Sequence, residues 1–277
     1  MRKYIILLLF VAMSGFSSRT QSSFESGEFV KLRIHYGVLN AGYATLEVKD
    51  AVVNNKKVFH AVGKGYTTGM SRFFFKVDDT YESYFDKETG LPYRFVRKID
   101  EGGYTKNMEG FFDQSADKVL VKDYKSGANK SFNVADKTQD VMSMFYYLRN
   151  HPNIDNLKVG ESVAVNMFFD EEVSQFKLKF VGRENVDTKY GRIPSMIFKP
   201  LVQSGRVFKE KESVTVWISA DQNKIPVRIK ADLAVGSLKA DLDGIRGLKY
   251  PLGIIKKKKK TDNIFHELFQ QYREFNQ

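Results

Sequence analysis

Apolar and polar residues alternate over most of the chain, with one interruption near its middle. In the first such run, Leu32 and Ile34 fall on one side and Arg33 on the other, which is typical of a half-buried strand. Turn signals such as Asn54-Asn55 and Gly102-Gly103 separate successive runs, so neighbouring runs are expected to pair antiparallel. The pattern predicts a mainly β fold, a large antiparallel meander that forms a curved sheet or an open barrel.

The interruption, residues 136–151, has the spacing of a helix. Its apolar positions recur three and four residues apart, at Val141, Met142, Met144, Phe145 and Leu148. Asp136 and Gln139 are placed to form an N-terminal capping box, and Pro152 would end the helix. We therefore predict a β-rich domain over residues 29–242, with two β halves around one central packed helix.

Two further segments have apolar helical faces. Met70, Phe73 and Phe74 predict a short helical turn that either plugs the core or forms a lid over an apolar cavity, with the core plug favoured. Residues 243–277 are expected to form a basic loop and an amphipathic C-terminal helix. This tail either caps the β domain or docks on a membrane or a partner, and its acidic residues favour capping.

The first residues predict export. A positive start, a short apolar run and small residues up to Ser18 are typical of a secretory signal peptide over residues 1–18. We expect residues 19–28 to form a flexible leader. The chain has no cysteine, so we expect no disulfide and no lipid anchor on a cysteine. The expected location is the periplasm, with secretion as the alternative.

The formal net charge is +11, and part of it is one basic run: Lys256, Lys257, Lys258, Lys259 and Lys260. Export argues against nucleic acid as a partner. An anionic envelope surface is a more natural partner for the run, which could equally be a solvated loop that only aids solubility.

The sequence contains no established pattern for catalysis. There is no G-x-S-x-G elbow, no H-E-x-x-H and no glycine-rich phosphate loop. Carboxylates cluster at Asp78, Asp79 and Glu82 and again at 170–172, where a glycosidase pair is conceivable but turn and strand-edge charge is simpler. The four histidines lack metal-ligand spacing. We expect no catalytic residue, no metal and no cofactor.

Several segments together resemble an exported bacterial family known only as a domain of unknown function. The residues that carry the resemblance are Tyr36 with Ala41-Gly42, Tyr81–Asp86 with Gly90-Leu91-Pro92, Gln139–Ser143, Tyr146–Arg149, and Val216–Ser219 with Ile225-Pro226-Val227. The family is more loosely similar to the curved sheets of periplasmic carriers that shelter lipoprotein acyl chains. The resemblance covers about residues 29–242 and implies a location and a shape, with no catalytic residues.

The leading hypothesis is therefore a non-enzymatic envelope protein that binds an apolar or amphiphilic, lipid-like ligand in its curved sheet. The side chains expected to line the ligand site are Met70, Phe73, Phe74, Met142 and Phe145. One alternative is a structural or interaction module held at an anionic envelope surface. The other is an enzyme that acts on envelope glycan.

Overall fold

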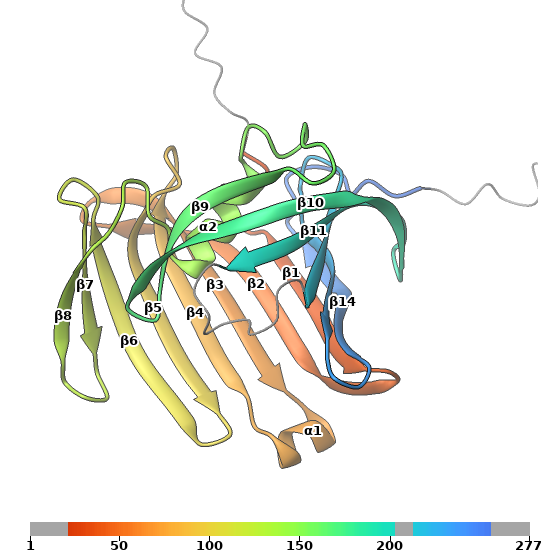
Figure 1. Cartoon of the computed structure of the whole chain (residues 1–277), viewed down its shortest axis with the longest axis horizontal. Coiled ribbons are helices and arrows are strands. Elements are labelled where there is room, and N and C mark those ends of the chain that lie inside the picture. Colours follow the sequence, from red (N-terminus) through yellow and green to blue (C-terminus); the bar gives the residue numbers. More distant parts are fainter. Residues whose placement is uncertain (1–21, 203–212, 256–277) are drawn as a thin grey trace, which may run out of the picture.

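A computed structural model describes residues 22–202 and 213–255. Within them, fourteen strands form one antiparallel sheet in the order β8-β7-β6-β5-β4-β3-β2-β1-β14-β13-β12-β11-β10-β9 (Figure 1). The first eight strands are β1 Phe29–Tyr36, β2 Leu39–Val53, β3 Lys56–Thr67, β4 Asp78–Asp86, β5 Pro92–Glu101, β6 Tyr104–Asp113, β7 Lys118–Asp123 and β8 Asn129–Asn133. The others are β9 Ser162–Phe169, β10 Glu172–Thr188, β11 Gly191–Val202, β12 Val214–Ser219, β13 Pro226–Asp232 and β14 Ser237–Arg246.

The alternation of the sequence explains the register at the centre of the sheet. On β1, Val30 and Leu32 are buried, and Leu32 pairs with Ala44 of β2 on one side and Leu242 of β14 on the other. The β1–β14 pairing joins the two β halves, so the sheet is continuous from β8 to β9. The prediction of a mainly β, antiparallel curved sheet is confirmed.

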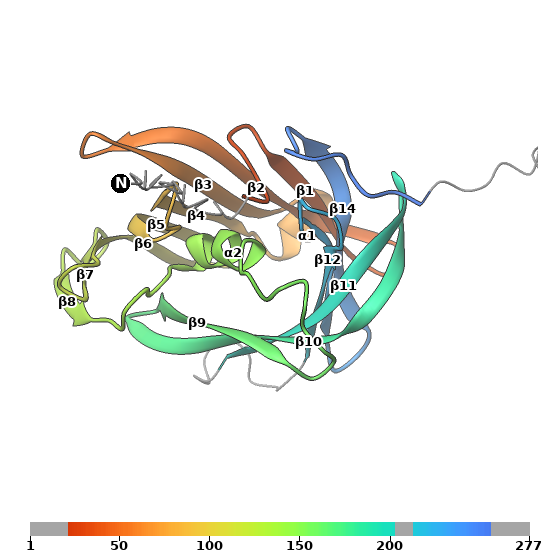
Figure 2. The ribbon, with the colours of Figure 1, turned by 90° about the horizontal axis from the view of Figure 1, so that it is seen from above.

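Helix α2, Val141–Arg149, lies inside the curve of the sheet. In Figure 2 it lies between β2–β4 on one side and β9–β10 on the other, and it contacts β3, β4 and β9. At Gly63 of β3, a Cβ atom would lie 2.8 Å from Sδ of Met142. The glycine therefore lets the helix approach the sheet closely.

The helix is shorter than the predicted 136–151, and its cap differs. Asp140 is the N-cap and Ser143 completes the capping box, in place of Asp136 and Gln139. The reason is that Gln139 pairs in parallel with the edge strand β9, donating its N–H to Asn166 O at 2.8 Å. A residue held in this extended pairing cannot also belong to the first helical turn.

The two edges of the sheet meet through side chains rather than through strand pairing. Asp170, in the β9–β10 turn, forms ion pairs with Arg97 of β5 and with Lys106 of β6, the latter at 2.5 Å. Beside it, Glu171 pairs with Lys130 of β8 at 2.8 Å. Phe168 of β9 packs against rings from the facing strands, namely Phe95, Phe112 and Phe132. We call this contact the seam, and it gives the open sheet a barrel-like shape.

The expected flexible leader, residues 19–28, is corrected where the structure describes it. Phe24 is only 3% exposed, and its ring centroid lies 4.7 Å from that of Tyr146 on α2 and 5.2 Å from that of Phe59. Glu28 is also buried. The segment packs because Phe24 covers apolar side chains between α2 and the sheet.

Two other predictions fall partly or wholly outside the described residues. The signal peptide and the basic run Lys256–Lys260 with the helical tail lie outside them. The predicted loop from residue 243 is corrected at its start, because β14 continues to Arg246 in its pairing with β1.

Candidate functional site: an apolar cavity beneath the inner helix

A cavity of about 520 Å³ lies between α2 and the curved sheet. Its apolar walls come from α2, from β1 and β2, and from β9 to β13. The lining includes Leu32, Ala44, Leu46, Met142, Phe145, Met167, Phe176, Leu178, Phe198, Val216 and Ile229. Tyr81, Arg149 and Lys224 are the lining residues with polar groups. Such a site can hold an apolar chain, with polar contacts at few points.

The structure divides the predicted ligand-binding residues into two groups. Met142 and Phe145 line the cavity. Met70, Phe73 and Phe74 do not: they lie on α1, Gly69–Phe74, where they are 77%, 87% and 77% exposed. The predicted helical turn is present, but the expected core plug is wrong, because α1 extends beyond the ends of β3 and β4 and buries none of its residues (Figure 1).

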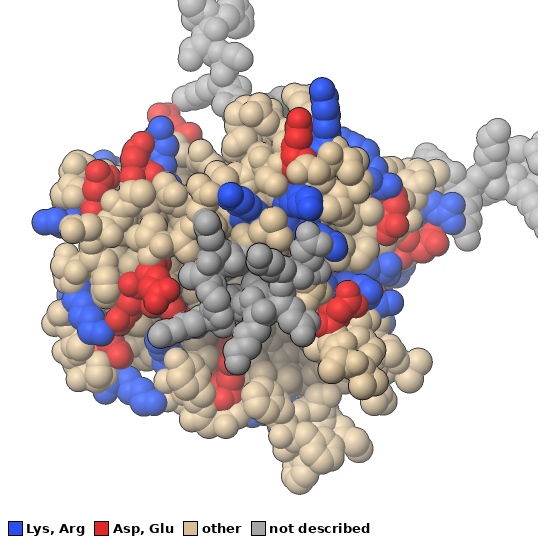
Figure 3. Space-filling model, in the orientation of Figure 1, with Lys and Arg blue, Asp and Glu red and all other residues tan. Residues whose placement is uncertain are grey.

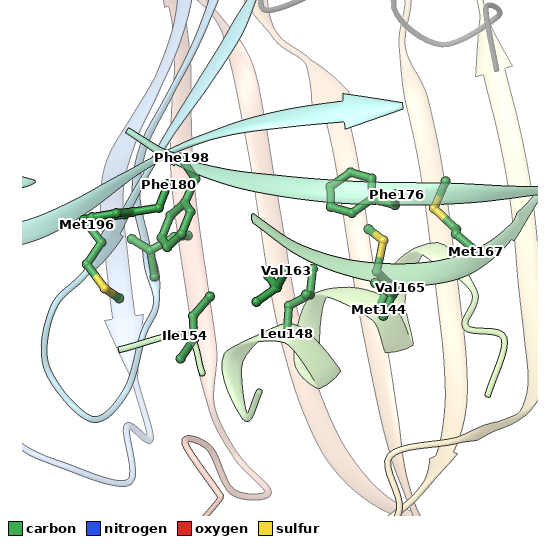
Figure 4. Close-up of a cluster of buried hydrophobic side chains, with 11 residues drawn as sticks. Met144, Leu148, Ile154, Val163, Val165, Met167, Phe176, Phe180, Met196 and Phe198 are labelled. Carbon is green, nitrogen blue, oxygen red and sulfur yellow. The ribbon is translucent and has the colours of Figure 1, made fainter. Parts of the chain in front are cut away.

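One face of α2 packs against β9 and β10 and forms a hydrophobic core with them. Met144 and Leu148 point toward Val163 and Val165 of β9, and Phe176 of β10 lies above them (Figure 4). This packing holds β9 and β10 against the helix. Met144, Leu148 and Phe176 also line the cavity, so this part of the core borders it.

The N-terminal end of α2 is anchored to β4 through Asp140. Its carboxylate accepts hydrogen bonds from the backbone N–H groups of Met142 (2.8 Å) and Ser143 (3.0 Å), and from the hydroxyl of Ser83 on β4 (2.5 Å). Burial raises the pKa of Asp140 to about 6, and these hydrogen bonds limit the rise. One buried carboxyl group therefore caps the helix and fixes it to the sheet.

The C-terminal end of α2 is anchored through Arg149. The guanidinium donates to both carboxylate oxygens of Glu28, at 2.6 and 2.8 Å, and to the carbonyl of Asn223 at 2.6 Å. The Asn223 side chain in turn donates to Tyr250 O at 3.0 Å. Four segments thus meet at one buried cation: the leader, the helix, the β12–β13 turn and the segment after β14.

Sequence reasoning missed this second anchor. Arg149 and Glu28 are 121 positions apart, and no local sequence motif around either residue predicts that they pair. The one available signal was an arginine in the last turn of an apolar helix, which is also what a favourable helix dipole would produce.

The acidic residues found in the sequence mostly have side-chain partners. Asp78 forms an ion pair with Arg72 at 2.6 Å, and Glu82 forms a hydrogen bond with His60 at 2.8 Å. Asp79 forms a hydrogen bond with Glu101 of β5, and this bond raises the pKa of Glu101 to about 7. Among the described residues, no group of three or more histidines and carboxylates is placed to hold a metal ion.

The fold defines the class: a barrel-like, open antiparallel sheet wrapped around one inner helix. The chain belongs to the family described as a protein of unknown function, DUF3108, whose model matches residues 31–243. The predicted resemblance to a domain of unknown function is thereby confirmed, while export remains a prediction. No curated protein matches the chain.

One solved structure agrees with this class. The structure is similar to the crystal structure of a β-barrel-like protein of the domain of unknown function DUF1849 from Brucella abortus, with 10% identity and a TM-score of 0.54. The match covers 82% of this chain and 99% of that one. A "putative lipoprotein" from Parabacteroides distasonis matches at 12% identity over 81% and 98% of the two chains, with a TM-score of 0.33. The first likeness shows the fold alone.

Proposed function

We propose that this protein binds an apolar or amphiphilic, lipid-like ligand in the cavity beneath α2, without catalysing a reaction on it. The observation that carries the proposal is the cavity itself, about 520 Å³ with walls that are almost wholly apolar. Ligand sites are typically about 300–1,000 Å³ and mainly apolar. Burial contributes roughly 25 cal/mol per Å² of apolar surface, so an acyl chain could bind here by burial alone.

The position of Lys224 favours a ligand that is an amphiphile with an acidic headgroup. It lines the cavity, its side chain is 10% exposed, and its ammonium lies 3.1 Å from the more exposed carboxylate of Asp155. The other cation of the lining, Arg149, is already engaged by Glu28 and Asn223. An anionic headgroup would therefore compete with Asp155 for Lys224, with its chain among the apolar walls.

We place this function outside the cytoplasm, in the periplasm or after secretion. The supporting feature is the signal-peptide pattern of residues 1–18. Within residues 22–202 and 213–255, the structure has no helix long and apolar enough to cross a membrane. An anionic envelope surface remains the proposed partner of Lys256–Lys260.

The first test is an organic extract of the protein, purified from its native cells without detergent and analysed by mass spectrometry. We expect a lipid in stoichiometric amount. The second test is titration with a fluorescent fatty acid. Ala44→Trp fills the cavity and should weaken binding by about tenfold or more, because it removes apolar surface that the chain would cover.

The matched control is Ala116→Trp, since Ala116 is exposed in the β6–β7 turn, away from the cavity. It should bind the fluorescent fatty acid like the wild type. A clean extract after incubation with envelope lipids, combined with no fatty-acid binding by the wild type, would overturn the proposal.

A further inference from the structure

One end of the sheet carries apolar side chains that nothing in the described structure covers. Strands β1 to β4 are consecutive antiparallel neighbours, so the β1–β2 turn and the β3–β4 connection lie at the same end, and the pairing of β1 with β14 brings the β13–β14 turn there too. These three tips carry the side chains that we call the apolar rim: Val38, Leu39, Met70, Phe73, Phe74 and Val235. Each is between 68% and 95% exposed.

Contacts between the tips make the rim continuous. The hydroxyl of Tyr36 donates to the carbonyl of Val235 at 3.0 Å, which joins the β13–β14 turn to the end of β1. The hydroxyl of Ser71 on α1 donates to the carbonyl of Asn40 at 3.3 Å, which joins α1 to β2. In Figure 1, α1 is the lowest element and the two hairpin tips lie beside it.

The rim segments differ in charge from two of the turns at the opposite end of the sheet. The three rim segments, residues 37–40, 69–75 and 233–236, contain no carboxylate, and Arg72 is their single charged residue. At the other end, turns 86–91 and 113–117 each contain two carboxylates. The projection that α1 makes at the lower edge of Figure 3 correspondingly lacks red atoms.

We propose that the apolar rim is a membrane-docking surface that inserts its side chains into the interface of a bilayer containing anionic lipid. Exposed apolar clusters on soluble domains mark interaction sites. The rim consists of projecting tips rather than a groove or a flat face, a shape that penetrates a fluid surface more readily than it matches a protein. The rim segments themselves carry no carboxylate, and the nearest one at α1, Asp78, is paired with Arg72, so repulsion from anionic headgroups is small.

This proposal is independent of the ligand in the cavity, because none of the rim residues lines it. It is also distinct from attraction by Lys256–Lys260. Binding by a lysine run is electrostatic and is screened at high salt, whereas insertion of apolar side chains persists. Salt concentration therefore separates the two contributions in one assay.

The test is co-sedimentation of the full chain, purified from its native cells, with vesicles of phosphatidylethanolamine and phosphatidylglycerol. It is done at about 1 M salt, where the Debye length is about 3 Å. The rim variant is Phe73→Ser with Phe74→Ser, and both side chains are exposed, so folding should be retained. We expect its partition onto vesicles to fall by about tenfold or more, because two aromatic side chains no longer enter the bilayer.

The matched control is Val52→Ser with Val159→Ser, two apolar residues that are 66% and 71% exposed outside the rim. It should partition like the wild type. Equal partition of the rim variant and the wild type, or no partition of the wild type, overturns the proposal. Sedimentation velocity without vesicles tests whether the rim instead binds a second copy of the chain. A dimer formed by the wild type and lost in the rim variant would assign the rim to that contact.

Discussion

At the scale of single residues, Asp140 links the stability of the inner helix to pH. The pKa of its carboxyl is raised by burial from 3.8 to about 6. The folded state therefore holds the proton more tightly than the unfolded chain does. The stability that this group contributes is full below about pH 4 and is lost as the pH rises through about 6. The loss corresponds to about 3 kcal/mol at neutral pH.

Asp140→Asn gives a reference that does not titrate. The amide oxygen can still accept the N–H bonds of Met142 and Ser143, and the Ser83 hydroxyl can accept from the amide nitrogen. We expect the free energy of unfolding of the wild type, relative to the variant, to decrease by about 2 kcal/mol between pH 4 and pH 7. Urea denaturation at several pH values measures this difference. A difference that stays constant with pH would contradict the role of Asp140.

At the scale of elements, α2 keeps its position above the cavity because both of its ends are anchored. Arg149 and Glu28 are 3% and 1% exposed, so removing one partner leaves an unpaired buried charge. We expect Arg149→Met to lower the free energy of unfolding by about 3–5 kcal/mol. The double variant Arg149→Met with Glu28→Met should recover a large part of this loss, since an apolar pair replaces both charges.

Chemical denaturation of both variants and of Glu28→Met completes a double-mutant cycle. A cycle in which the two single changes are simply additive would show that the ion pair does not couple the leader to the helix. Fatty-acid titration of the double variant provides a further readout, because a helix that is no longer fixed to the leader should change the cavity along with the stability.

The sequence predicts some elements much better than others. Strands such as β1 are predicted from alternation, because one face is buried at every second position. The start of α2 is not predicted, since the pairing of Gln139 with β9 depends on residues almost thirty positions away. The exposure of α1 is also not predicted, because an apolar helical face indicates a helix but says nothing about whether another element lies opposite.

In the candidate site too, some residues could be predicted from the sequence and others could not. Met142 and Phe145 could be assigned to the cavity from the helical period and the sheet that precedes it. Its other walls, such as Phe176 and Val216, have the same alternation as ordinary core strands, so the sequence does not distinguish a wall from a filled interior. A cavity depends on where the helix is anchored, and the anchors are contacts between distant residues.

At the scale of the whole molecule, the seam decides whether the sheet keeps its barrel-like shape. Strand pairing runs from β8 to β9 without closing the circle, so the two ends are held by the Phe168 ring and the ion pairs of the β9–β10 turn. Burial alone would raise the pKa of Asp170, but the hydrogen bonds from Lys106 and Arg97 outweigh it and lower the pKa. This carboxylate therefore stabilises the seam above its unfolded pKa, and the contribution is lost as the pH falls through its lowered folded pKa.

Asp170→Asn tests this closure. We expect a loss of about 1–3 kcal/mol in the free energy of unfolding, since two cations lose their charged partner in a half-buried place. Hydrogen exchange should become faster in β8 and β9 but stay unchanged in the central strands β1 and β2, because local opening begins where strand pairing ends. The control is Asp243→Asn, whose carboxylate is similarly exposed and also pairs with two cations, Lys31 and Lys189, but away from the seam. If both variants speed exchange in the same strands, the ion pairs of the seam do not close the sheet, and the barrel-like shape depends on Phe168 and its neighbouring rings instead.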